Sequence, residues 1–207
     1  MGPSGLESVP LPVGNVPIPS LYQADLDGNG LSESLLITDN RLSILSGGKI
    51  VWQSPSNWQI AQAAIGDLNQ DGKPEVSLLV WRPSHPWPVD QWLPYGGRIA
   101  NFHNAEGLSC HIILIGWCRN AYRELWAGSA MADPITSFFP LDIDGNGTQE
   151  LVVLESRYKD ERNAPARKLK VWEWNGFGFS VVSSMDGIFY HIIPVRAVDD
   201  RVLILLP

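Results

Sequence analysis

Three stretches of nine residues, 25–33 (DLDGNGLSE), 67–75 (DLNQDGKPE) and 142–150 (DIDGNGTQE), align with one another without a gap. Each follows a short, partly apolar run, and each is followed by another: SLLIT, VSLLVW and LVVLES. Short β-branched runs bounded by Gly, Asp and Asn are typical of strands. The sequence therefore predicts three acidic loops, each joining two strands of a repeating unit.

A hairpin-like pair of strands follows each loop: RLSILSGGKIVWQS, HIILIGWCRNAYRELWAGS and KLKVWEWNGFGFSVVSS. Each unit then has four strands, and no helix is strongly indicated. The first two loops start 42 residues apart, which fits the roughly 40 to 45 residues of a four-stranded β-propeller blade. The next interval is longer because a Pro- and Trp-rich insertion occupies residues 82–109 of the second unit. A weaker alternative is that residues 102–115 (FHNAEGLSCHIILI) contain a degenerate fourth loop.

The predicted fold is all-β, a β-propeller of four-stranded blades with about three and a half blades in this chain. The expected blades cover residues 16–58, 59–132 and 133–185, followed by a half blade at 186–207 and preceded by a flexible leader at 1–15. A propeller typically has four to eight blades, and open blade edges invite strand pairing. We therefore expect either a piece of a longer protein or a ring completed by another protein chain or a second copy.

Composition narrows the class of protein. The 207 residues are 44% hydrophobic and 18% charged, the balance of a folded globular chain. Lys and Arg total 15 against 22 Asp and Glu, a net charge of −7 that argues against a nucleic-acid partner. No apolar run approaches the roughly 20 residues of a membrane span, and the N-terminal residues lack the pattern of a signal peptide.

The two cysteines, Cys110 and Cys118, are expected to be free thiols rather than a disulfide, because an intervening strand would hold them too far apart.

The acidic loops carry oxygen-bearing side chains at loop positions 1, 3, 5 and 9. These are Asp25, Asp27, Asn29 and Glu33; Asp67, Asn69, Asp71 and Glu75; and Asp142, Asp144, Asn146 and Glu150. Together with a backbone carbonyl expected from position 7, which is Leu31, Lys73 and Thr148, they form the kind of oxygen cage that Ca²⁺ prefers. The sequence thus predicts up to three Ca²⁺ ions, with Mg²⁺ the weaker competitor.

The EF-hand and the plain Asx turn are the rival structures for these loops. The EF-hand needs a bidentate Glu at loop position 12, and here that position is Leu36, Leu78 or Val153, so the EF-hand is excluded. A single DxDGNG could be an Asx turn without an ion, but three copies in one register, each closing with Glu, favour the metal site.

The three loops between apolar strands resemble the FG-GAP or VCBS repeats of integrin-α-like β-propellers, over about residues 16–185. The resemblance implies calcium binding by the nine-residue loops on one rim of the blades. It also implies an extracellular, periplasmic or cell-surface protein, because such repeats occur mostly where millimolar calcium fills weak sites.

No arrangement of side chains in the sequence identifies an enzymatic reaction. The four histidines lack metal-ligand spacing, and neither a GxSxG motif nor a Gly-rich phosphate loop is present. We therefore expect a non-enzymatic protein-protein interaction module or structural scaffold subunit. The alternative is lectin-like glycan binding through Trp87, Trp92 and Tyr95 of the insertion, unless that insertion is a lid whose tryptophans pack against a neighbouring blade. The basic stretch 157–170 is expected to be a solvated hairpin tip.

Overall fold

The computed structural model describes residues 16–17, 22–85, 92, 101–196 and 202–205. The predicted leader at residues 1–15 lies outside the described residues, as do residues 86–91 and 93–100 of the insertion. Within the described part of the chain, no helix has the length and apolar character needed to cross a membrane.

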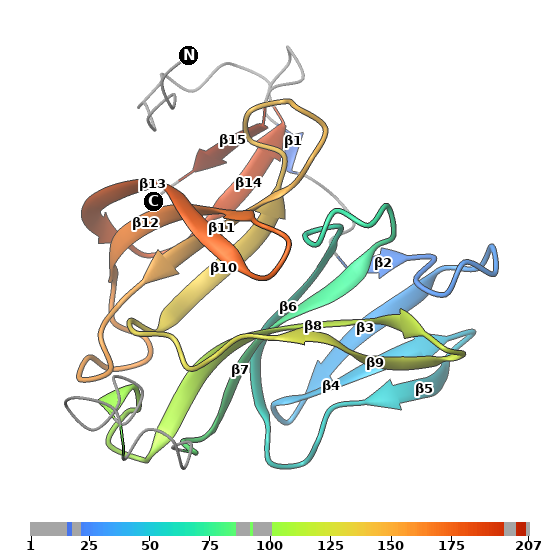
Figure 1. Ribbon diagram of the computed structural model, residues 1–207, viewed down its shortest axis with the longest axis horizontal. Helices are drawn as coiled ribbons and strands as arrows, with labels where there is room; N and C mark the ends of the chain where they lie inside the picture. Colours follow the sequence, from blue (N-terminus) through green and yellow to red (C-terminus); the bar gives the residue numbers. More distant parts are fainter. Residues whose placement is uncertain (1–15, 18–21, 86–91, 93–100, 197–201, 206–207) are drawn as a thin grey trace.

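Three antiparallel sheets of four strands follow one another along the chain, and each keeps its strands in sequence order (Figure 1). The first sheet contains β2 (Gln23–Ala24), β3 (Glu33–Thr38), β4 (Arg41–Ser46) and β5 (Lys49–Gln53). The second contains β6 (Gln59–Gly66), β7 (Glu75–Pro83), β8 (Leu108–Cys118) and β9 (Ala121–Ala127). The third contains β10 (Ile135–Leu141), β11 (Glu150–Glu155), β12 (Ala166–Trp174) and β13 (Phe179–Phe189). The all-β class and the four-stranded units expected from the sequence are thus confirmed.

Local turn chemistry explains several of the hairpins. Two consecutive residues with positive φ join β3 to β4 (Asp39, Asn40) and β8 to β9 (Arg119, Asn120). Such two-residue turns match the right-handed twist of the flanking strands, and Asn and Asp tolerate this backbone better than most residues. Each of these two connections is therefore as short as a hairpin allows.

A fourth, smaller sheet joins the two ends of the described chain. Its strands are β14 (Ile193–Arg196) and β15 (Val202–Leu205), and β1 (Val16–Pro17) adds to the free edge of β14. Two paired antiparallel strands therefore lie within the half blade expected at residues 186–207. Residues 16–17, however, pair with this sheet and not with the first sheet, and β13 continues to Phe189, beyond the expected boundary at residue 185.

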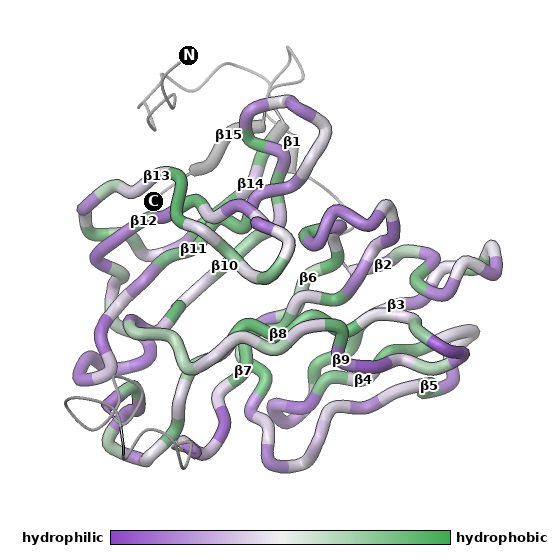
Figure 2. Tube along the Cα trace, viewed as in Figure 1, coloured by the Kyte–Doolittle hydropathy of each residue, from purple (hydrophilic) through white to green (hydrophobic). Residues whose placement is uncertain are grey.

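The core lies between consecutive sheets. One cluster of buried side chains joins the first and second sheets around Leu42, Ile44 and Val80, and another joins the second and third sheets around Leu79 and Phe138. A third cluster covers the other face of the third sheet. Figure 2 shows the resulting concentration of hydrophobic residues along β7 and β8 in the middle of the molecule.

The second sheet also holds both cysteines. Cys110 is buried and Cys118 is half-buried, and both are free thiols, as the sequence predicted.

Candidate metal centres

The first acidic loop joins β2 to β3 and folds around the carboxylate of Asp25. Its Oδ1 accepts hydrogen bonds from the backbone N–H of Gly28 (2.8 Å) and Asn29 (3.0 Å), and its Oδ2 accepts one from Gly30 (2.8 Å). Gly28 and Gly30 have φ of +75° and +87°, which side chains other than glycine rarely adopt. The position 1 aspartate and the two glycines therefore determine the tight turn together.

The other two loops repeat this hydrogen-bond register. Asp142 accepts from Gly145 (2.8 Å), Asn146 (3.1 Å) and Gly147 (3.0 Å). In the second loop, Asp67 accepts from Asp71 (3.0 Å) and Gly72 (2.9 Å). The sequence alignment of the three loops is therefore also a structural alignment.

The residue at position 5 organises the end of each loop. Its side-chain oxygen accepts a hydrogen bond from the backbone N–H of position 7 in all three loops, at 2.8 Å for Leu31, 3.0 Å for Lys73 and 2.7 Å for Thr148. The side chain of Leu31 is 65% exposed, so this residue contributes to the loop through its backbone.

The position 9 glutamates are the first residues of β3, β7 and β11, and they are buried. Glu33, Glu75 and Glu150 are 0%, 1% and 3% exposed. Each accepts a hydrogen bond from the backbone N–H of position 2, at 2.9 Å in every loop. A strand residue with its carboxylate turned under the loop thus forms the floor of each site.

The second oxygen of these glutamates differs between the loops. Glu33 Oε1 accepts a hydrogen bond from the Ser46 hydroxyl at 2.8 Å. Glu75 Oε2 and Glu150 Oε1 are buried and have no hydrogen-bond partner among the described residues. A buried polar oxygen without a partner costs about 1–3 kcal/mol, and more when it is charged. These two atoms therefore need a ligand or a proton.

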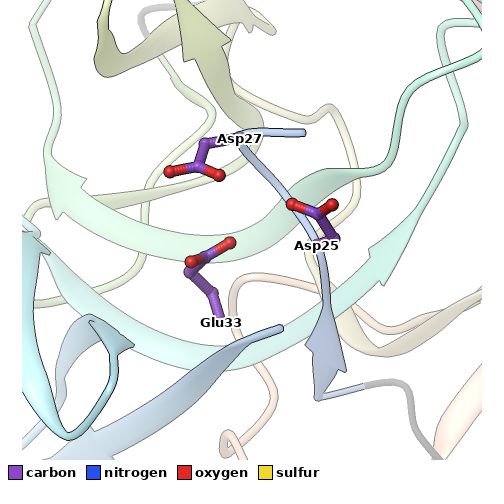
Figure 3. A group of neighbouring side chains, drawn as sticks. All are labelled: Asp25, Asp27 and Glu33. Atoms are coloured by element: carbon purple, nitrogen blue, oxygen red, sulfur yellow. The ribbon is translucent and has the colours of Figure 1, made fainter. Parts of the chain in front are cut away.

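Three carboxylates converge at each site. In each loop, the side chains of positions 1, 9 and either 3 or 5 place one oxygen each within 4.8 Å of the others. Figure 3 shows the first of these clusters, with the carboxylates of Asp25, Asp27 and Glu33 facing a common space.

Burial and mutual repulsion raise the pKa of two of the glutamates. Burial is the largest cause at Glu75, whose pKa rises to about 8, and the charges of Asp67 and Asp71 add to it against the lowering effect of two backbone N–H groups. Burial likewise raises the pKa of Glu150, with further contributions from the two aspartates of its own loop. A hard cation would relieve both effects, because it satisfies the carboxylates and compensates their charge. Since the converging ligand atoms are all carboxylate oxygens, the donor set fits a divalent cation that prefers oxygen.

A link between the second and third loops was not anticipated from the sequence. The side-chain Oε1 of Gln149 accepts a hydrogen bond from the backbone N–H of Asp67 at 2.7 Å. Gly66 permits this approach, because a Cβ at that position would collide with Oε1 of Gln149 and with the Cβ of Pro140. The corresponding position 8 residues, Ser32 and Pro74, give no sequence signal for such a role.

Two features singled out in the sequence lie away from the acidic loops. In the Trp-rich insertion, Trp92 is 81% exposed, whereas Trp87 and Tyr95 lie outside the described residues. The basic stretch 157–170 has an exposed tip at residues 161–163, as expected, and the guanidinium of Arg162 in this tip lies 4.5 Å from the ring centroid of Trp81 in the second sheet.

Comparison with known proteins finds a similar solved structure but no match of the sequence to a protein family or to a curated protein. No family model matches the sequence, and no curated protein matches it. Among solved structures, the chain is similar to BBS1N in a crystal structure of BBS1N in complex with ARL6DN, soaked with lead. The two share 12% sequence identity with a TM-score of 0.49, over 92% of this chain and 54% of that chain. This chain therefore spans about half the length of that one.

Proposed function

We propose that this chain is a calcium-stabilised β-propeller module of the FG-GAP or VCBS type, and that it acts as a protein-protein interaction or structural scaffold subunit rather than as an enzyme. The observation that supports the metal most directly is the pair of buried carboxylate oxygens without a partner, Glu75 Oε2 and Glu150 Oε1. They occur in loops whose remaining carboxylates already converge within 4.8 Å.

Calcium suits these loops better than other divalent ions. It takes six to eight oxygens in flexible geometry, whereas Mg²⁺ requires a near-ideal octahedron and retains several waters. Nitrogen and sulfur ligands, which favour zinc and copper, do not contribute to the three clusters in the described residues. A divalent ion would reduce the charge of three carboxylates from −3 to −1 and would connect the two strands that flank each loop.

Calcium binding of this kind contributes to folding, because the unfolded chain has no preformed site. Weak sites in scaffold modules are filled at the millimolar calcium concentrations outside cells. We therefore place the module in an extracellular, periplasmic or cell-surface setting.

A thermal melt tests the metal proposal. The melting temperature should rise in millimolar CaCl₂ relative to EDTA, and it should rise less in the same concentration of MgCl₂. A variant with all three position 1 aspartates changed, Asp25→Asn, Asp67→Asn and Asp142→Asn, should lose the calcium response. The matched control is Asp186→Asn, an exposed aspartate on β13. Equal melting temperatures of the unmodified chain in EDTA and in calcium would refute the proposal.

The interaction role is supported by the first sheet, which is less covered than its counterparts. Strands β7 and β11 are buried along nearly their whole length, but the equivalent strand β3 is exposed over its last three residues. Leu36 is 50% exposed, and it lies opposite Ser43, which puts it on the other face from Leu42 and Ile44. In the second and third sheets the corresponding face packs on the preceding sheet.

We propose that a sheet of a second copy covers this face and thereby completes the ring. Sedimentation velocity should then show a dimer, and the Leu36→Lys variant should sediment as a monomer with an unchanged circular dichroism spectrum. A monomer for the unmodified chain at high concentration would refute this part of the proposal.

A further inference from the structure

The same group of three aromatic rings occurs at two boundaries between sheets. In the first sheet Trp52 lies opposite Ile44, and in the second Trp126 lies opposite Leu114. The strand register makes these two positions equivalent, because Ile44 and Leu114 in turn lie opposite Leu35 and Ser77, each two residues after the position 9 glutamate. The next sheet contributes a cross-strand aromatic pair in each case. The first trio is Trp52, Trp117 and Tyr122, and the second trio is Trp126, Trp174 and Phe179.

The second trio is closed. The ring centroid of Trp126 lies 5.7 Å from that of Trp174 and 5.3 Å from that of Phe179, and the latter two are 5.2 Å apart. The indole N–H of Trp126 also donates a hydrogen bond to the Phe177 carbonyl at 2.8 Å. Packing and hydrogen bonding thus fill this boundary with the chain's own side chains.

The first trio is open. Trp117 and Tyr122 keep the edge-to-face contact, with centroids 5.0 Å apart. Among the described residues, however, Trp52 makes no ring contact with either of them, nor does its indole N–H bond to Asn120, the counterpart of Phe177. A cleft of about 360 Å³ lies there instead, and its lining includes the three aromatic residues together with Asp27, Ser46 and Asn120. We name it the aromatic cleft.

The aromatic cleft is polar because it differs from the closed boundary at two positions. Tyr122 stands where the closed trio has Phe179, and Asp27 stands at the loop position that is Asn69 in the second sheet. The Tyr122 residue is 7% exposed, and its hydroxyl is buried without a hydrogen-bond partner in the described structure. The Glu33 carboxylate lies beside the hydroxyl, but the two groups do not reach the length and angle of a hydrogen bond, so the hydroxyl can still accept one from a ligand.

We propose that the aromatic cleft binds the guanidinium group of an arginine side chain from a partner protein. A guanidinium is planar and cationic, so it stacks on a tryptophan face and donates to a carboxylate at the same time. Here the faces are supplied by Trp52 and Trp117. The carboxylate is that of Asp27 in the first acidic loop, whose two oxygens each accept one hydrogen bond from Asn29 and can each accept a second. The Tyr122 hydroxyl accepts one of the remaining guanidinium N–H groups. The local charge is complementary with or without calcium, since three carboxylates around one divalent ion still leave −1.

This inference deepens the proposed interaction role by naming the chemistry of the partner, but it does not depend on calcium. The probe is N-acetyl-L-arginine methylamide, titrated into the ¹⁵N-labelled full chain while the tryptophan indole N–H resonances are followed by NMR. The resonances of Trp52 and Trp117 should shift with saturation, and that of Trp126 should not. N-acetyl-L-citrulline methylamide, which has nearly the same shape without the charge, should bind at least tenfold more weakly.

Two variants and one control locate the site. Tyr122→Phe, which recreates the residue of the closed trio, should weaken arginine binding roughly three- to tenfold. Trp52→Leu should abolish it. The control is Phe177→Ala, because Phe177 is 88% exposed and lies beside the closed trio. This variant should bind the arginine probe with the same affinity as the unmodified chain.

Three results would overturn the inference. It fails if none of the probes shifts Trp52 or Trp117, if citrulline binds as well as arginine, or if only methyl α-D-glucoside shifts these resonances, which would indicate a carbohydrate site. The titration is repeated in EDTA. Arginine binding that persists in a protein without a calcium response would refute the metal proposal alone, and a calcium response without arginine binding would refute the cleft alone.

Discussion

Replacing Glu75 by glutamine should change the stability of the protein in opposite directions with and without calcium. Glu75 is 1% exposed, and its Oε1 accepts backbone hydrogen bonds from Leu68 (2.9 Å) and Asn69 (3.2 Å), while its Oε2 has no partner among the described residues. Glutamine retains the size of the side chain and the accepting oxygen. It also removes the negative charge. That buried charge destabilises the metal-free protein, whereas it contributes to binding when calcium is present.

The magnitude follows from the pKa of Glu75, which burial raises from 4.5 to about 8 in the metal-free protein. At pH 7 the unfolded chain is ionised and the folded chain is mostly protonated. The difference amounts to about 3 kcal/mol at 1.36 kcal/mol per pKa unit. Because the amide of glutamine also needs a partner, we expect Glu75→Gln to stabilise the metal-free protein by about 1–3 kcal/mol.

The raised pKa of Glu75 also determines how the stability of the metal-free protein changes with pH. A raised pKa in the folded state makes the metal-free protein lose stability as the pH rises from about 4.5 to about 8. The gain from glutamine in EDTA should therefore shrink as the pH is lowered toward 4.5. In saturating calcium the variant has lost one charged ligand, and a 10- to 100-fold weaker affinity corresponds to a loss of about 1–3 kcal/mol.

Urea unfolding monitored by tryptophan fluorescence measures both effects at pH 7, in EDTA and in calcium. The control is Glu161→Gln, an exposed glutamate for which both conditions should give changes near zero. A stability change of the same sign in EDTA and in calcium would refute the reasoning, because the buried carboxylate would then have no special relation to a metal.

Three further predictions concern packing and buried ionisable groups in the sheets. Gly66→Ala should destabilise the protein by about 1–3 kcal/mol in urea unfolding, since its Cβ would lie 2.7 Å from a proline of β10, whereas Gly178→Ala meets only an ordinary 3.5 Å contact and should be tolerated. Lys170→Met should cost about 3–5 kcal/mol because it leaves the buried Glu155 carboxylate without its ion pair, and adding Glu155→Leu should recover most of that loss; no recovery would contradict the explanation. Burial lowers the pKa of His111 to about 4, so calcium-bound protein should lose stability as the pH falls from 6.5 to 4, and His111→Asn should have a flatter pH profile over that range.

Much of the local structure could be predicted from the sequence. The three acidic loops, the strands on either side of them and the glutamate at position 9 were all evident from spacing. The reason is that the interactions that shape each loop occur within nine residues, as in the contacts of Asp25 with Gly28 and Gly30. The buried but unpartnered oxygens of Glu75 and Glu150 could not be predicted, because burial depends on the sheets that pack above them.

The relations between sheets came only from the tertiary structure. The sequence runs SLLIT and LVVLES look alike, yet β3 is partly exposed and β11 is fully buried. The pairing of residues 16–17 with β14 joins segments almost 180 residues apart. The two aromatic trios share their register and differ only in Tyr122 against Phe179, but one is closed and the other open.

Hydrogen bonds between near neighbours are encoded in short-range spacing, and so the sequence by itself determined the loops and their flanking strands. Whether a sheet face is covered or a trio of rings closes depends on how whole sheets approach one another. That approach is set by contacts between residues tens of positions apart, and only the tertiary structure decided it.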